Sequence, residues 1–300
     1  MPILTTPWLA GAIAGLLGRG PGPRIAPEIA FAQLPVLTAD AVVPTRHGDV
    51  RATVYAPPGG LAGAPVYVNF HGGAFIMRHP EQDDPLCRYL AHECGVAVVN
   101  VDYDVAPRHP FPVPVEQGYD AVVWAAGADR EWDGTRLVVG GQSAGGAIAA
   151  AVARQARDAG APTIRLQVLQ YPPLDLVTPG AQKKAAGRSI ISVPMTQVAD
   201  TVYVPADASK RDPRASPAWQ GNLGPGALTG QAPAVVVSCA NDRLRDEDVR
   251  YAEALDAEGL LVEHIALPGV DHGYNIMGAQ RDVVEGAYRR IAAHVRRAVA

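Results

Sequence analysis

The chain has 300 residues, of which 48% are hydrophobic and 19% charged, and its formal net charge is −4 at pH 7. A chain this apolar can bury a large core, which excludes global disorder. The slight acidic excess and the lack of a basic stripe exclude nucleic acid as a partner.

The first 40 residues are rich in Pro and Gly and show no clear strand. An apolar run covers residues 8–17, but no Lys or Arg precedes it and it is too short to span a bilayer. We expect a capping segment of the folded protein, with a signal peptide as the alternative. No other run approaches membrane length, so we expect no membrane span.

Short apolar, β-branched runs then alternate with helical patterns. The runs lie at 65–70, 96–101, 136–139, 166–171 and 234–239, and the helical patterns include 115–126 and 284–298. Nearly continuous apolar runs are typical of parallel strands that are covered on both faces. The alternation predicts an α/β fold with a mostly parallel central sheet flanked by helices, as one domain over residues 1–300.

Residues 173–232 interrupt this alternation and are punctuated by Pro and Gly, with one short helix expected near 195–204. An interruption of about sixty residues is too long for a plain loop. We expect a lid or cap over the edge of the sheet. Trp8 and Trp219 are candidates for lining a substrate pocket, although core packing suits both equally well.

The cysteines are Cys87, Cys94 and Cys239. An odd, sparse set is not a disulfide framework and is typical of a reducing compartment, so we expect a cytoplasmic protein. No Cys-x-x-Cys or close His pair accompanies them, and we expect no metal site.

Ser143 is the candidate nucleophile, because the segment 141–145 fits the pattern Gly-x-Ser-x-Gly. An apolar strand precedes it and an Ala-rich helix beginning near Ala144 follows it, as a nucleophile elbow requires. Gly141 and Gly145 supply the small residues that so sharp a turn needs. The first N–H groups of the helix would lie beside the hydroxyl.

The segment His71-Gly72-Gly73-Ala74 directly follows the strand at 65–70. Backbone donors in such a loop lower the energy of the oxyanion that forms during acyl transfer. The N–H of Ala144, the residue after the nucleophile, would be the second donor set.

A serine hydroxyl needs a base, and His272 stands on a loop between a strand pattern at 261–267 and the last helix. Catalytic side chains concentrate at such loops. His264 lies inside the strand pattern and His294 inside the final helix, so we expect structural roles for both.

The acid that orients the base should lie between Ser143 and His272 in the chain. Asp242, just after the strand at 234–239, is the choice. Its rivals are Asp246, which resembles a helix N-cap, Asp271, which is adjacent to the histidine, and Asp175, which follows the strand at 166–171.

With these residues in order, the sequence resembles the hormone-sensitive-lipase-like family of α/β-hydrolases. The resemblance covers about residue 50 to the end. It rests on segments 71–75, 102–112, 142–146, 212–217, 242–247 and 272–274.

The resemblance implies an α/β-hydrolase fold and a Ser143–His272–Asp242 triad under a helical cap, contributed by about 1–40 and part of 173–232. It implies oxyanion donors at the N–H groups of Gly73, Ala74 and Ala144, with His71 and Gly72 supporting the loop. This chain departs from the family pattern at Ala74, where a third glycine is usual, and at Gln142, where Asp is usual.

The expected function is a carboxylesterase that hydrolyses short- to medium-chain acyl esters through an acyl-enzyme, with a small-molecule ester as its partner and no cofactor. An amidase, deacetylase or formamidase with the same triad is the alternative, and a non-hydrolytic binding protein is a third reading. Whether the chain is a monomer or a dimer stays open.

Overall fold

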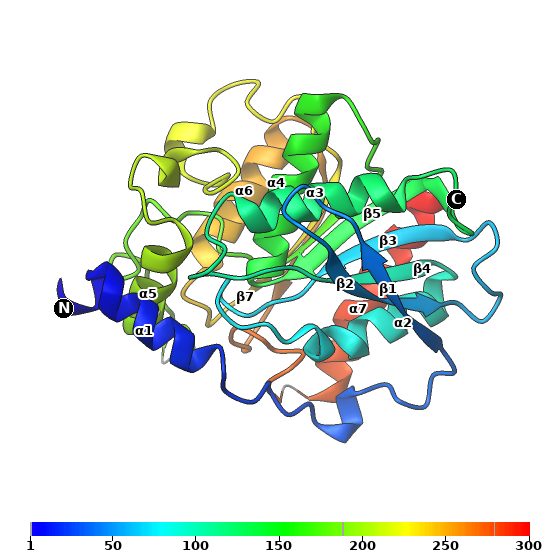
Figure 1. Ribbon diagram of the computed structural model, residues 1–300, viewed down its shortest axis with the longest axis horizontal. Helices are drawn as coiled ribbons and strands as arrows, with labels where there is room; N and C mark the ends of the chain where they lie inside the picture. Colours follow the sequence, from blue (N-terminus) through cyan, green and yellow to red (C-terminus); the bar gives the residue numbers. More distant parts are fainter. Residues whose placement is uncertain (1, 188, 279) are drawn as a thin grey trace.

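The computed structural model describes residues 2–187, 189–278 and 280–300. In these residues an eight-stranded sheet has the order β1-β2-β4-β3-β5-β6-β7-β8 (Figure 1). The strands are β1 Leu37–Val43, β2 Val50–Ala56, β3 Pro65–Phe70, β4 Ala97–Asp102, β5 Asp133–Gln142, β6 Leu166–Gln170, β7 Ala234–Cys239 and β8 Leu261–Leu267. Neighbouring strands pair in parallel from β4 to β8, and β2 pairs antiparallel with both β1 and β4.

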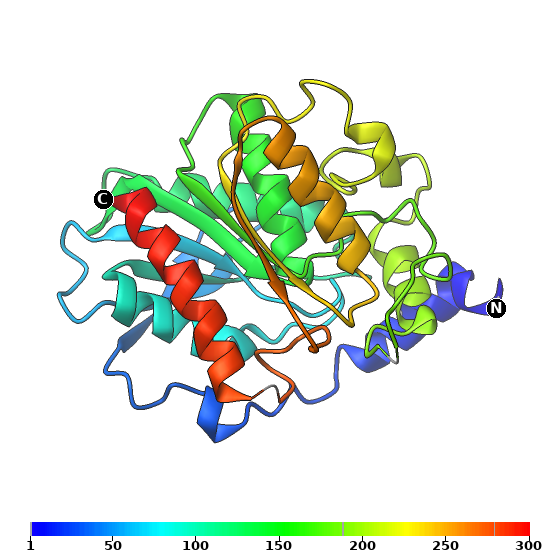
Figure 2. The ribbon, with the colours of Figure 1, turned by 180° about the vertical axis from the view of Figure 1, so that it is seen from behind.

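Helices cover both faces of this sheet (Figures 1 and 2). On one face lie α3 Val113–Ala125, α4 Ala144–Ala159 and α6 Arg245–Ala257, and on the other lie α2 Asp84–Cys94 and α7 Arg281–Val299. Two further helices, α1 Pro7–Leu17 and α5 Val193–Tyr203, lie side by side beyond one end of the sheet. Short 3-10 helices cover Pro2–Thr5, Pro27–Ile29, Pro80–Asp83, Ser209–Arg211 and Gln220–Asn222.

The core lies between the sheet and its two helical layers. Every residue of β3, β4 and β7 is buried, as expected for strands that helices cover on both faces. The Ala-rich helix α4 buries its side chains over the centre of the sheet, where small residues let the backbones approach closely. The predicted α/β fold with a mostly parallel sheet is therefore confirmed.

The expected elements agree closely with the observed ones. The runs at 65–70 and 234–239 are β3 and β7, and those at 96–101 and 166–171 differ by one residue from β4 and β6. The run at 136–139 is the centre of the longer strand β5, and the helix expected near 195–204 is α5.

All three cysteines are free.

Two expectations about local structure are wrong. Strand β1 begins at Leu37, within the stretch that shows no clear strand in the sequence, because this edge strand is exposed except at its end and lacks an apolar pattern. Asp246 is not the N-cap of α6: the helix begins at Arg245 with Leu244 as its N-cap.

The elbow between β5 and α4 packs tightly against the end of β3. A Cβ atom on Gly145 would lie 1.8 Å from the carbonyl oxygen of Phe70, and one on Gly141 would lie 2.5 Å from the same oxygen. Both contacts are with backbone, which cannot rotate away. Glycine is therefore required at both positions, and it lets the elbow touch the segment that enters the loop at 71–74.

Gly145→Ala tests this constraint. We expect a loss of at least about 3 kcal/mol in the free energy of unfolding, because the backbone contact forces the elbow and β3 apart. Urea unfolding followed by circular dichroism measures it. The control is Gly286→Ala in α7, where no atom lies within 4 Å of the new Cβ and about 1 kcal/mol of stabilisation is expected. Equal midpoints for Gly145→Ala and the wild type would contradict the account.

Candidate active site

Ser143 stands at the junction of β5 and α4 with φ 52° and ψ −125°. A positive φ is strained for a residue with a side chain, and such strain persists only where the surroundings hold it. Here the Ser143 N–H donates to the carbonyl of Gln170 at 2.8 Å, and the Ser143 carbonyl accepts from the N–H of Gly146 at 2.9 Å. These two bonds hold the turn that presents the hydroxyl.

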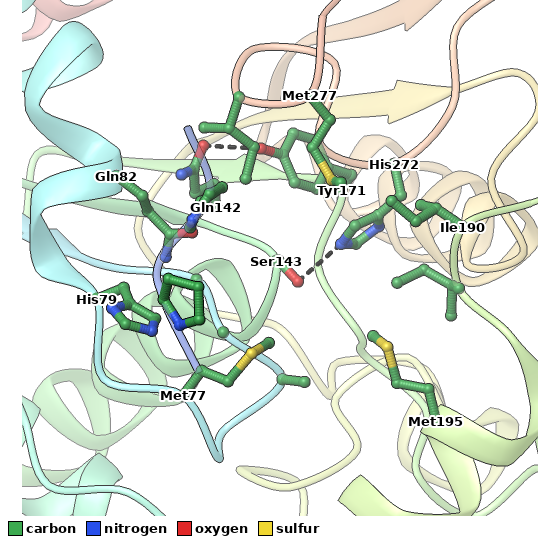
Figure 3. A pocket seen from close by; sticks show the side chains of 17 residues that line it. Met77, His79, Gln82, Gln142, Ser143, Tyr171, Ile190, Met195, His272 and Met277 are labelled. Carbon is green, nitrogen blue, oxygen red and sulfur yellow. Dashed lines mark hydrogen bonds between the residues drawn. The ribbon is translucent and has the colours of Figure 1, made fainter. Parts of the chain in front are cut away.

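Three predicted side chains form one hydrogen-bonded chain. His272 Nε2 lies 2.8 Å from Ser143 Oγ, and its Nδ1 lies 2.7 Å from Asp242 Oδ2. The first of these contacts is drawn in Figure 3. Asp242 Oδ1 accepts from the N–H of Leu244 at 3.0 Å, and Asp242 is 1% exposed. The three residues come from the carboxyl ends of β5, β7 and β8, which the parallel sheet brings to one edge.

Two of the other candidates for the acid that orients His272 have different partners. Asp175 accepts from Thr178 and pairs with Arg250 at 2.9 Å. Asp246 is paired with its exposed neighbour Arg245.

Asp271 faces away from the imidazole of the next residue and serves a different segment. Its Oδ1 accepts from Ser189 Oγ at 2.9 Å, and its Oδ2 accepts from the N–H of Ile190 at 2.6 Å. It also accepts from the N–H of His272 at 2.8 Å. Asp271 therefore ties the loop that carries the base to the segment that precedes α5, a role that nothing in the local sequence indicates.

The other histidines of interest have structural partners. His264 Nε2 lies 2.8 Å from Ser238 Oγ across β7 and β8, and His294 Nε2 lies 2.7 Å from Glu263. Neither approaches Ser143.

The loop after β3 lies directly against the elbow. A Cβ on Gly72 would be 3.4 Å from Ser143 Cβ, which is ordinary contact distance. Within the described residues, the N–H groups of Gly73, Ala74 and Ala144 have no hydrogen-bond partner. They remain available to a ligand atom next to the serine.

The loop takes an unusual backbone path. Ala74 and Phe75 have φ values of 53° and 62°, and Gly73 has 128°. A Cβ on Gly73 would lie 2.3 Å from the carbonyl oxygen of Met77, so only glycine fits there. At Ala74 the backbone accepts a Cβ in the left-handed region. The ring of Phe75 stacks on Tyr203 of α5 at 3.7 Å between centroids, which helps to hold this conformation.

His71 is buried beneath the loop. Its Nδ1 lies 2.7 Å from the carbonyl oxygen of Gly72, and its ring stacks on Tyr103 at 4.3 Å. The Tyr103 hydroxyl donates to the His71 carbonyl at 2.7 Å. Burial lowers the pKa of His71 to about 4, so the ring is neutral at pH 7 and braces the loop without adding charge.

A cavity of about 280 Å³ opens at Ser143. Figure 3 shows Met77, Met195 and Met277 around it, together with Ile190. Methionine is flexible and fills irregular space, so this wall can adapt to apolar groups of different shape. Trp8 is 74% exposed, and neither it nor Trp219 is among the residues that line this cavity. The methionines carry no motif that the sequence alone would single out.

A smaller cavity that Ser143 also lines has charged groups in its wall. Lys183 and Asp200 line it, and Lys183 Nζ pairs with Glu247 at 2.7 Å. Burial raises the pKa of Asp200 to about 6 and that of Glu247 to about 7, against the opposing effect of Lys183.

In the part of the chain that the structure describes, no three His, Cys, Asp or Glu side chains gather as a metal-binding group. Within the same residues, no helix combines the length and apolar character that crossing a membrane needs.

Comparison with known proteins places this geometry in a family. Residues 67–276 match a family model described as alpha/beta hydrolase fold. The chain is 35% identical to the carboxylic ester hydrolase LipN of Mycobacterium tuberculosis, over 85% of this chain and 66% of LipN. It is 33% identical to an ethyl acetate hydrolase of Pseudomonas putida, over 82% of this chain and 78% of that protein.

Solved structures agree. An esterase of the archaeon Pyrobaculum calidifontis superposes with a TM-score of 0.80 at 31% identity, covering 100% of this chain and 94% of that one. The metagenomic carboxylesterase EstE1 gives a TM-score of 0.77 at 30% identity, with both chains covered completely. The chain therefore belongs to the hormone-sensitive-lipase-like family of α/β-hydrolases, a family of carboxylic ester hydrolases.

Proposed function

We propose that this chain is a serine carboxylesterase that hydrolyses short- to medium-chain acyl esters through an acyl-enzyme. The observation that carries the proposal is the hydrogen-bonded chain from Asp242 through His272 to Ser143. It ends beside the free N–H groups of Gly73, Ala74 and Ala144.

In the first half-reaction, His272 Nε2 takes the proton of Ser143 while Oγ attacks the acyl carbon. Asp242 holds the Nδ1–H tautomer and stabilises the imidazolium. The negative charge that develops on the former carbonyl oxygen is met by the three backbone donors, each worth about 3 kcal/mol of barrier lowering. The tetrahedral intermediate then collapses, His272 protonates the departing alkoxide, and an acyl-Ser143 ester remains.

In the second half-reaction, His272 takes a proton from water, which attacks the acyl carbon of the Ser143 ester. The same donors hold the second oxyanion. When the acyl carbon–Oγ bond breaks, His272 returns the proton to Ser143, and the carboxylic acid leaves.

The cavity supports an apolar small-molecule ester as the substrate. Its volume of about 280 Å³ and its methionine wall suit an aliphatic group of a few carbons. One relative is named as an ethyl acetate hydrolase, which acts on a small ester, and another as a carboxylic ester hydrolase.

We further propose a cap formed by about 1–40 and part of 173–232 within a single α/β-hydrolase domain spanning 1–300. Three observations support this cap. Helix α1 packs on α5 with Ala10 and Ala14 fully buried. Pro21 and Pro23 line the cavity from the N-terminal side, and Met195 lines it from α5.

A series of p-nitrophenyl esters tests the proposed function. We expect kcat/KM to rise by up to about fourfold per added methylene while the chain fills the cavity, since each buried CH₂ contributes about 0.8 kcal/mol, and to fall once the chain is longer. The matched p-nitroanilides should react at least about 100-fold more slowly. Faster anilide turnover would support an amidase, and activity that survives in Ser143→Ala would contradict the mechanism.

Asp271→Ala tests how the cap is anchored. Losing the acceptor for Ser189 Oγ and the Ile190 N–H, at about 1 kcal/mol per bond, should speed hydrogen exchange at Ile190 by up to about 30-fold, as measured by mass spectrometry. The control is Asp256→Ala, which changes an exposed carboxylate on α6. Unchanged protection in Asp271→Ala would show that other contacts hold this segment.

A further inference from the structure

A buried polar cluster lies next to the nucleophile, and two of its members, Gln142 and Tyr171, also line the cavity. Its members come from segments far apart in the chain, and each is at most 1% exposed: Asn69, Asp83, Gln142, Tyr171 and Asn275. We call these five residues the Asp83 cluster. Buried polar networks carry a large penalty wherever a partner is missing, so their geometry is tightly determined.

Asp83 and Gln142 form the centre of the Asp83 cluster. Gln142 Nε2 donates to Asp83 Oδ1 at 2.6 Å, and Asn69 Nδ2 donates to Asp83 Oδ2 at 2.9 Å. Asn69 is the next-to-last residue of β3, two residues before the loop at 71–74, and Gln142 precedes Ser143. One carboxylate therefore joins the loop that would bind the oxyanion to the elbow that holds the nucleophile.

The oxygen of the Gln142 amide contacts the loop that carries His272. Gln142 Oε1 accepts from the Tyr171 hydroxyl at 2.7 Å and from Asn275 Nδ2 at 2.5 Å. Asn275 lies three residues after His272, and the Tyr171 ring meets the His272 ring edge to face at 4.7 Å. Gln142 thus connects the elbow to Asp83 on one side and to Tyr171 and Asn275 on the other. Figure 3 shows its hydrogen bond with Tyr171.

We propose that Asp83 and Gln142 act as a pair of positioning residues, which hold the oxyanion loop, Ser143 and His272 in their mutual geometry while Asp83 is ionised. The inference rests on the proposed function and extends it to two residues outside the triad. Misplacement by about 1 Å at such a site can lower the rate by about 100-fold.

The charge state of Asp83 is part of this inference. Burial raises the pKa of Asp83 to about 7, although hydrogen bonding from Asn69, Gln142 and the backbone of Gly72 lowers it. Glu81 adds a small further increase. Phenols and one thiol near Asp83 have pKa values that burial raises, so they are neutral at pH 7: Tyr55, Tyr67, Cys87, Tyr103, Tyr171 and Tyr288.

As a carboxylate, Asp83 accepts a hydrogen bond from each of its donors. Once protonated, its own O–H points toward one of those donors, and that hydrogen bond is lost. Protonation, as the pH falls through about 7, therefore breaks a contact in the Asp83 cluster. We expect kcat/KM of the wild type to fall as the pH drops through about 7, with a contribution from the protonation of Asp83. In Asp83→Asn this contribution should be absent, so the acidic fall in kcat/KM should involve one proton fewer than in the wild type.

A double-mutant cycle tests the pair. In Asp83→Asn, the new amide N–H points at groups that are themselves donors. In Gln142→Glu, two carboxylates lie side by side and repel each other. Each variant should therefore lower kcat at least about tenfold and change KM by no more than about threefold. The combined variant keeps every contact, because the amide introduced at position 83 can donate to the carboxylate introduced at position 142 while its oxygen accepts from Asn69. Its kcat should return to within about fivefold of the wild type.

The control is Tyr288→Phe, which removes the hydroxyl that accepts from Asn275 Nδ2 at 3.0 Å from outside the cluster. It should lower the melting temperature and leave kcat within about twofold of the wild type, since one neutral hydrogen bond is lost. The proposal is overturned if the combined variant is no faster than the slower single variant, or fails to fold, or if coupling appears in unfolding but not in kcat. A wild type without esterase activity would instead count against the proposed function.

Discussion

The close approach of two backbones, at Gly145 of the elbow and Phe70 at the end of β3, sets the geometry of the whole site. No side chain fits between them, since a Cβ would lie 1.8 Å from the Phe70 carbonyl oxygen. The contact brings Ser143 and the loop at 71–74 together before any ligand is present. A parallel sheet makes this possible because the carboxyl ends of its strands meet at one edge.

This arrangement holds a strained backbone conformation at the candidate nucleophile and in the loop beside it. Ser143, Ala74 and Phe75 all have positive φ, which costs about 1–3 kcal/mol each. Stacking under the loop and the hydrogen bonds of the Asp83 cluster oppose that cost. Donors fixed in this way need no reorganisation when charge develops, which is the main source of electrostatic catalysis in acyl transfer.

The sequence predicts those parts of the structure that local patterns determine. Local patterns predict the apolar strands, the glycines of the elbow, and the chain order of Ser143, Asp242 and His272. The structure brings these last three side chains together. Strand β1 is not readable, because its exposure leaves no apolar alternation. The roles of Asp83 and Asp271 are also not readable, because their partners lie 59 and 81 residues away and only the folded chain brings them into contact.

The central claim is that Ser143 is the nucleophile. Incubation with a fluorophosphonate, followed by peptide mapping with mass spectrometry, tests it most directly, because this reagent forms a stable bond only with an activated hydroxyl. The account predicts one phosphonyl group per chain on Ser143, lost in Ser143→Ala and strongly slowed in His272→Ala. A label on any other residue, or labelling that persists in Ser143→Ala, would contradict it.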